Sequence, residues 1–518
     1  MWFLLFSIMG FYLISMLVFG TTTFADPIRG YEIMNQYISG AKWNTLIYPS
    51  VNHPEFSYFV SWWAPAQWVI PFVFVKLFSV DSFQIIQFFL ISICLFISLI
   101  GYYKLFRRFD FSLNVILLAL ICIVTNQLFY WQTFMYYGGD LYFLAILPFY
   151  VMCILNLKES QNFRTILLYL FLSFLAVLVK NTGFILLFAS LLFLFFTVEN
   201  KALIGKIKYI IFPFLICFLI YFILDRYYLS LGESPGKSID YEGYPGVKND
   251  LLGDLTYSLG SPFGIFSRFT FFIQKIYSVF TSNLVYSNTL QVIPFIVTGL
   301  FLYKFPKNRF KLYYSCLLFF CIPFLLFFTF LFLQNKAVSY EMRHFASVSF
   351  LFFPGIIYWF NTLKFRKILQ VLIIGFCLLD SSLYFLSLIK IEKTHSFWNT
   401  LKLPNEDVNL LSEIRKWDLS TNNGLLIVED YWQLSIGGRK NDKLTLKKKN
   451  EKYYVVSGME LDSPDQIMLD KRFFKRYSSI LLISSKNKPE GIVELKKYKD
   501  FRRIKETNRF SIFKSIEH

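Results

Sequence analysis

Apolar runs close to 20 residues long alternate with short polar loops through the first three quarters of the chain. A run of that length can cross a bilayer as an α-helix. We therefore expect a polytopic α-helical membrane protein of about eleven spanning helices. These are predicted near residues 2–20, 82–103, 112–130, 141–157, 164–179, 183–198, 208–224, 289–303, 312–333, 346–362 and 367–389.

Basic residues concentrate in alternate loops of this pattern, which is typical of cytoplasmic loops. The N-terminus is therefore predicted in the cytoplasm, and three long segments are predicted outside, at 21–80, 225–288 and 390–518. The first 389 residues would form the membrane module. The basic loops lie near 104–108, 158–164, 201–208, 304–311 and 364–367.

Two apolar segments need a decision. Residues 55–80 hold Pro65, Pro71 and three tryptophans, and counting them as a span would move the basic loop KLFRR outside. We expect an interfacial helix on the outer side there. Residues 2–20 precede TFA and so resemble a signal peptide, but they lack a basic start and form a long run, which favours a spanning helix.

The tail, residues 390–518, has a different pattern. Short β-type runs (LLIVED, YYVVSG, SILLISS and FSIF) alternate with charged, helix-like segments. This pattern predicts a small extracytoplasmic α/β domain. Half of the basic residues of the chain lie in the tail, 26 of 52 Lys+Arg.

Composition supports the membrane class. Of 518 residues, 55% are hydrophobic and only 17% are charged, and Phe alone contributes 64. These values exclude a soluble globular domain and a disordered chain. The net charge of +18 follows the loop pattern and the tail, so no nucleic-acid partner is expected. All seven cysteines lie in apolar runs, so no disulfide framework or Cys-based metal site is predicted.

A small set of polar residues is predicted to meet at the outer membrane face, although its members come from distant parts of the chain. Each has a structural alternative: a helix cap for the acidic residues, snorkelling for the basic ones, and an ordinary loop position for the histidine of NHPEF. Charged groups at this depth are costly unless they are paired or used, so their convergence favours a site. The set consists of Asp26, His53, Asp140, Lys180, Arg343 and His344.

These side chains indicate a chemistry. A carboxylate can remove a proton from an attacking hydroxyl, and cations can stabilise a departing phosphate. A site at the level of the headgroups suits a lipid-linked phosphate whose tail lies among the helices.

Several phrases, in order, resemble the GT-C membrane glycosyltransferases, in the branch that contains protein O-mannosyltransferases and lipid A aminoarabinose transferases. An Asp follows the first helix in ADPIRGYEIMNQYISGAKWNTLIYP, and HPEFSYFVSWW stands where the family has a K/H-P-P motif. Further phrases are KLFSVDSFQ, YYKLFRRF, YYGGDLYF, VKNTGF and MRHFASVSFLFFP. The resemblance covers about residues 1–360.

The resemblance implies an inverting glycosyltransferase, a hexosyl- or pentosyltransferase. It would move a monosaccharide from a polyprenyl-phosphate donor to a hydroxyl of a lipid, glycan or protein acceptor, at the outer face of a bacterial cytoplasmic (inner) membrane. Asp26 would be the catalytic base and Asp140 the second acidic residue of the cavity. His53, Lys180 and Arg343, with His344 beside it, would contact the donor phosphate.

The sequence departs from the family at two positions, Pro27 and Glu55. Because family members differ in metal dependence, no metal site is predicted and a divalent cation stays open. The tail has no WWDYG sequence, which argues against an oligosaccharyltransferase.

Two other classes of function stay open. A transporter or flippase for lipid-linked glycans would favour polar or broken helices at the midplane and internal repeats, and no repeat is evident. A membrane-anchored glycan-binding protein could use KLTLKKKNEK (443–452) in its tail, although a solvated charged surface explains that run equally well.

Overall fold

The computed structural model of the chain divides into two compact units, which we call the helical unit and the sheet unit. The helical unit comprises Met1–Met16, Trp62–Ala66 and Leu90–Lys393, and the sheet unit comprises Leu17–Ser61, Gln67–Phe89 and Thr394–His518. The structure describes residues 1–19, 22–23, 45–49, 57–59, 64–78, 83–136, 138–160, 162–198, 215–216, 218–228, 230, 251–268, 292–334, 341–391, 413, 416–417, 424–428, 454–457, 478–485, 500–506 and 510–516.

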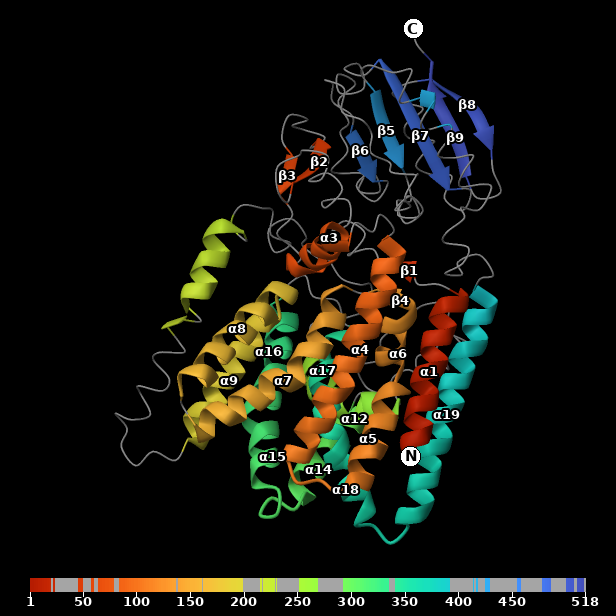
Figure 1. Ribbon diagram of the computed structural model, residues 1–518. Coiled ribbons are helices and arrows are strands. Elements are labelled where there is room, and N and C mark those ends of the chain that lie inside the picture. The colour runs from red at the N-terminus through yellow and green to blue at the C-terminus, as the bar shows by residue number, and fades with distance from the viewer. Residues whose placement is uncertain are drawn as a thin grey trace. The chain divides into compact units, whose positions relative to one another are not determined.

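The apolar runs form helices (Figure 1). Most bounds lie within a few residues of those that the sequence predicts. The helices are α1 (Trp2–Phe19), α3 (Ala66–Phe78), α4 (Phe83–Arg108), α5 (Leu113–Val124), α6 (Gln127–Phe134), α7 (Gly139–Glu159), α8 (Phe163–Val179), α9 (Gly183–Thr197), α12 (Leu251–Ser267), α14 (Val292–Lys304), α15 (Lys311–Cys316), α16 (Ile322–Leu333), α17 (Arg343–Ser349), α18 (Phe353–Asn361) and α19 (Arg366–Ile391).

Within the described part of the chain, three helical stretches have the length and apolar composition needed to cross a membrane. They are Ile85–Arg108, Gly139–Glu159 and Lys311–Leu333. Shorter apolar helices include α1, α5, α8, α9 and α14. The count of eleven spans stays a prediction, since the run at 208–224 is described only in part.

Some predicted helices are interrupted, and the sequence explains where. The run at 112–130 breaks at Thr125–Asn126, where the Asn126 side chain accepts a hydrogen bond from the Leu128 backbone N–H and so caps α6. The run at 312–333 is interrupted by a π-helical turn (Leu317–Cys321), which joins α15 to α16 just before Pro323. Proline has no backbone N–H to continue the regular pattern of helical hydrogen bonds.

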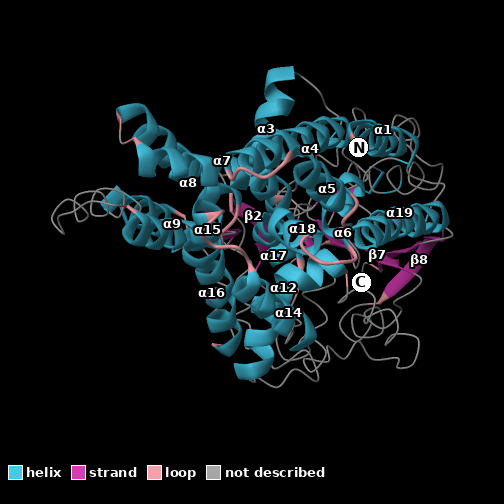
Figure 2. Cartoon of the chain, turned by 90° about the horizontal axis from the view of Figure 1, so that it is seen from below, coloured by secondary structure: helices cyan, strands magenta, loops and turns pink. Residues whose placement is uncertain are grey.

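The sequence pattern did not predict helix α12, which lies within the segment 225–288. It belongs to the helical unit and packs against α14, α16 and α17, and the outer position of the segment stays a prediction. Seen from below, α12 and α17 lie among the other helices (Figure 2). Its buried residues are largely small or polar, such as Gly260, Ser258 and Ser261, so protein packing rather than an apolar run buries it.

The sheet unit contains one mixed five-stranded sheet in the order β6-β5-β7-β9-β8. Strand β5 pairs in parallel with β6 and β7, whereas β9 pairs antiparallel with β7 and β8. The middle residues of β7, 480–483, are buried on both faces. The strands are β5 (Gly424–Val428), β6 (Tyr454–Ser457), β7 (Ser479–Ser485), β8 (Phe501–Glu506) and β9 (Phe510–Ser515).

Each of the four β-type runs of the tail is thus a strand, and β8 is an additional strand that the sequence pattern did not predict. The extracytoplasmic position of the tail stays a prediction. The remaining short strands are β1 (Thr22–Thr23), β2 (Thr45–Pro49), β3 (Ser57–Phe59) and β4 (Met135–Tyr136), and β2 pairs antiparallel with β3.

The ambiguous segment at 55–80 contains α3, which has 13 residues and Pro71 inside it. A spanning helix needs roughly 20 residues at a rise of about 1.5 Å per residue, so α3 is too short to cross a bilayer. Its predicted position at the membrane interface stays a prediction.

Candidate active site

Three of the predicted site residues come together at the ends of three helices. The Asp140 carboxylate forms an ion pair with the Lys180 ammonium through Oδ1, and Arg343 Nη1 lies 3.2 Å from Oδ2. Lys180 lies 40 residues and Arg343 lies 203 residues after Asp140 in the sequence. We call this group the Asp140 cluster.

The start of α7 fixes the carboxylate. Gly138 has φ 61°, a conformation that glycine adopts readily, and α7 begins directly after it. Asp140 therefore stands in the first turn of α7, where the helix dipole favours a negative charge.

The turn between α8 and α9 fixes the ammonium. Lys180 is the C-cap residue of α8, and its backbone N–H bonds to the Ala176 carbonyl at 3.1 Å. A Cβ atom at Gly183 would lie 2.4 Å from the same carbonyl oxygen, so only glycine allows this close turn. A cation at the C-terminal end of α8 also complements the helix dipole.

Arg343 opens α17 and contacts a second carboxylate, that of Glu341. The next residue, His344, stacks on Phe328 with ring centroids 5.9 Å apart. His344 is within electrostatic range of Lys180, Arg343 and Asp140. The four predicted site residues that the structure describes therefore lie close together.

An aromatic layer adjoins the charges. Lys180 Nζ lies 5.7 Å from the centre of the Phe143 ring, and Phe143 packs near Phe324, which packs in turn on Phe328. The three phenylalanines are buried or nearly so. An apolar layer of this kind lowers the local dielectric and strengthens electrostatic interactions beside it.

Three of the four charged side chains are mostly buried. Side-chain exposure is 9% for Asp140, 14% for Lys180 and 15% for Arg343, against 36% for Glu341. Two cations therefore face two carboxylates. An anion with several oxygen atoms could replace a carboxylate as the partner of Lys180 and Arg343.

The two remaining predicted site residues, Asp26 and His53, lie outside the described residues. His53 falls in the connection between β2 and β3. In the described ranges, no group of three or more His, Cys, Asp or Glu side chains is placed to hold a metal ion.

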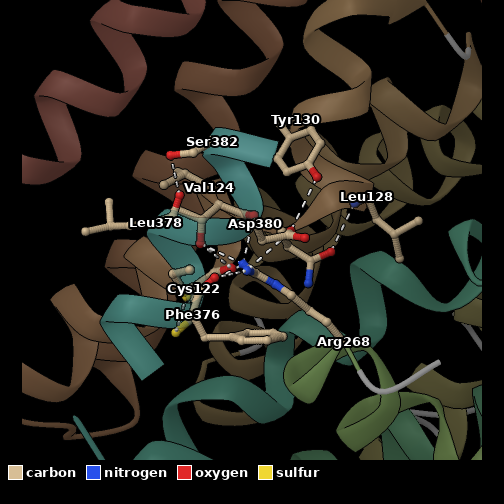
Figure 3. Close-up of polar contacts among 12 residues, drawn as sticks. Cys122, Val124, Leu128, Tyr130, Arg268, Phe376, Leu378, Asp380 and Ser382 are labelled. Carbon is tan, nitrogen blue, oxygen red and sulfur yellow. Dashed lines mark hydrogen bonds and ion pairs between the residues drawn. The ribbon is translucent and has the colours of Figure 1, made fainter. Parts of the chain in front are cut away.

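A second charged cluster was not found from the sequence. Arg268 follows α12 directly and forms an ion pair with Asp380 of α19, with Nη1 3.3 Å from Oδ2 (Figure 3). Tyr130 of α6 donates a hydrogen bond to the same carboxylate oxygen at 3.3 Å. We call this the Arg268 cluster. Its signal in the sequence was Asp380, an acidic residue inside a predicted span, which usually marks a buried partner.

The Arg268 guanidinium is 3% exposed and is bonded on several sides. Its Nη2 donates to the Thr125 carbonyl at 2.8 Å and to the Thr125 hydroxyl at 2.9 Å, and Nη1 donates to the Phe376 carbonyl at 3.2 Å. Figure 3 shows the side chain reaching across to α19, with Tyr130 on the far side of Asp380. The Arg268 cluster therefore joins the end of α12 to the break between α5 and α6 and to α19.

Comparison with known proteins supports the fold. No family model and no curated protein sequence matches the chain. Two crystal structures of ArnT from Cupriavidus metallidurans match it, each over 99% of this chain and 97% of theirs at 10% identity. The TM-score is 0.53 for ArnT in the apo state and 0.54 for ArnT bound to undecaprenyl phosphate.

At this identity the match establishes the fold. Together with the apolar helices, it confirms the predicted class of a helical membrane protein. The predicted resemblance to the GT-C branch that contains the lipid A aminoarabinose transferases is likewise confirmed at the level of the fold.

Proposed function

We propose that the chain is an inverting glycosyltransferase, which transfers a monosaccharide from a polyprenyl-phosphate donor to an acceptor hydroxyl. The observation that carries this proposal is the Asp140 cluster, in which Lys180 and Arg343 contact one carboxylate at the converging ends of α7, α8 and α17. ArnT, which shares the fold, has been crystallised with undecaprenyl phosphate, the type of lipid that such a site would hold.

The two cations suit the phosphate of the donor. Arginine can present two N–H groups to two phosphate oxygens, and lysine adds a compact positive charge. In the reaction the bond between the anomeric carbon and the phosphate oxygen breaks, and its electron pair stays on the phosphate. Lys180 and Arg343 would stabilise that developing charge.

The acceptor hydroxyl supplies the new bond to the anomeric carbon and loses its proton. We assign that proton to Asp26, acting as general base from the opposite face of the sugar, which gives inversion. His53 would assist at the phosphate. These two assignments come from the sequence motifs.

The proposed setting is the outer face of a bacterial inner membrane. The N-terminus would be cytoplasmic, and residues 390–518 would form an extracytoplasmic domain beside the membrane module of residues 1–389. The loop pattern of basic residues supports this orientation. The acceptor would be a lipid, a glycan or a protein.

The test is mass spectrometry of envelope lipids and glycans from four strains. These are the wild type, a deletion strain, and the deletion strain carrying either Asp26→Asn or Asp110→Asn. Asp110 is the matched control, because it is an exposed turn residue with φ 61°, a conformation that asparagine tolerates.

Asp26→Asn should lower transfer by about 10²–10⁴-fold, the usual contribution of a general base. One polyprenyl-phosphate sugar should accumulate in the deletion and Asp26→Asn strains, and the same sugar should be missing from a glycan. The Asp110→Asn strain should match the wild type. If Asp26→Asn also restores the wild-type profile, Asp26 is not the base, and a flippase or a glycan-binding protein becomes the better explanation.

A further inference from the structure

The charges of the Asp140 cluster cancel when Glu341 is counted with it. Lys180 and Arg343 supply two positive charges, and their partners Asp140 and Glu341 supply two negative charges. Buried cations are costly without a partner, so Asp140 stabilises Lys180 and Arg343 when no ligand is bound. Its effect on a bound phosphate is a separate question.

Asp140 is a poor candidate for a general base. Its two carboxylate oxygens already pair with two cations, Oδ1 with Lys180 and Oδ2 with Arg343, in the first turn of α7. It is also directed at the groups that would bind phosphate. Its geometry is that of a counter-ion to Lys180 and Arg343.

The charge on the phosphate changes during the proposed reaction, on which this inference rests. The donor is a phosphodiester with one negative charge, whereas the product is a phosphate monoester whose second pKa is about 6 and which carries nearly two charges at neutral pH. A site with two unopposed cations would hold the product more tightly than the donor. A carboxylate beside the same cations repels the second charge.

We propose that Asp140 is a positioning and specificity residue that keeps the site from retaining the phosphate monoester product. It orients Lys180 and Arg343 before the donor binds, and its charge offsets the gain in attraction when the monoester forms. The cluster thus favours a diester over a monoester relative to a purely cationic site, and the product leaves.

The experiment compares two soluble probes with the purified full chain in detergent. One is farnesyl monophosphate and the other is its methyl phosphodiester, and binding of each is measured by calorimetry or by displacement of a fluorescent isoprenyl phosphate. The readout is the ratio of the two affinities at about pH 8, where the monoester is doubly charged.

With Asp140→Asn, monoester affinity should rise by about tenfold relative to diester affinity, because one repelling charge near the ligand is gone. Asp140→Glu keeps the charge and should keep the wild-type ratio. If Asp140→Asn leaves the ratio unchanged, or weakens monoester binding, Asp140 has no such role and the proposal is overturned.

A measurement on the unaltered protein covers the case in which Asp140→Asn fails to fold. Between about pH 5 and pH 8 the monoester gains its second charge and the diester does not. The ratio should change by less than about twofold, because the net charge of the cluster is near zero. A rise of about tenfold would overturn the proposal. The diester corrects for titration of protein groups that face the site, including His344 on α17 and Glu341 before it.

Failure of the proposed function gives a different result. If Lys180→Gln does not weaken binding of either probe, the cluster is not a phosphate site and the glycosyltransferase proposal loses its support. If Lys180→Gln weakens both probes and Asp140→Asn leaves their ratio unchanged, only the role of Asp140 is wrong.

Discussion

The helical unit contains two charged clusters that are built in different ways. In the Asp140 cluster the charges stand at helix ends, and the side chains of Asp140, Lys180 and Arg343 are 9%, 14% and 15% exposed. In the Arg268 cluster the arginine is 3% exposed, and Asp380, which is 24% exposed, stands in the middle of α19.

The partners differ as well. The cations of the Asp140 cluster are held by side-chain carboxylates. Arg268 is held by the backbone carbonyls of Thr125, at the end of α5, and of Phe376 in α19 as well as by Asp380, and a mobile ligand cannot replace these backbone groups. This difference in partners is the basis for assigning binding to the Asp140 cluster, as proposed above, and packing to the Arg268 cluster.

The largest expected effect on this comparison comes from Arg268→Met. The change leaves the Asp380 carboxylate without its cation and removes the donor to two carbonyls, so the free energy of unfolding should fall by about 3–5 kcal/mol. Thermal unfolding in detergent, followed by tryptophan fluorescence, measures the loss. The double variant Arg268→Met/Asp380→Leu should recover part of it, because the uncompensated charge is gone. A single variant as stable as the parent would show that the Arg268 cluster is not a structural link.

Lys180→Gln should affect transfer more than stability. Removing one cation from the developing phosphate charge should lower transfer by about 10²–10³-fold. The unfolding temperature should fall less than in Arg268→Met, because Arg343 still pairs with Asp140. Lys304→Gln is the matched control. Lys304 also stands at the C-terminal end of a helix, but it is exposed and begins the basic loop near 304–311. Transfer in the lipid assay measures both. Equal activity of the two variants would contradict the separation of roles.

Tyr130→Phe should have a smaller effect, confined to stability. The phenol donates to Asp380 at 3.3 Å, and loss of that hydrogen bond should cost about 1 kcal/mol. Thermal unfolding detects this loss, and transfer by the folded variant should equal that of the parent. A fall in transfer without a fall in stability would mean that the Arg268 cluster also takes part in function.

The smallest effect on the free energy of unfolding is expected at an exposed ion pair, which serves as a reference for the two buried clusters. Arg108 and Glu159 form a salt bridge with side-chain exposures of 38% and 54%. Solvent and salt screen such a pair, so Glu159→Gln should cost less than about 1 kcal/mol. The cost should shrink further at high ionic strength in the same unfolding assay. A loss as large as that of Arg268→Met would show that exposure does not separate these pairs.

Much of the fold followed from local pattern. The apolar runs predicted the helix positions, because a spanning helix needs about 20 mostly apolar residues. Short β-type runs predicted four of the five strands described in the tail. The parity of basic loops also predicted that Asp140, Lys180 and Arg343 lie at one membrane face. The lipid requires apolar residues along each span, and the topology requires basic residues in the cytoplasmic loops, so both are visible in a single sequence.

What only the tertiary structure decided concerns burial by protein instead of lipid. Helix α12 has a face of small and polar residues that carries no apolar signal, and it is buried because α14, α16 and α17 surround it. The pairing of Arg268 with Asp380, 112 residues later, depends on that packing. So does the contact of both cations with the Asp140 carboxylate: sequence placed the charges at one membrane level, but ångström-scale distances come only from the way the helices pack.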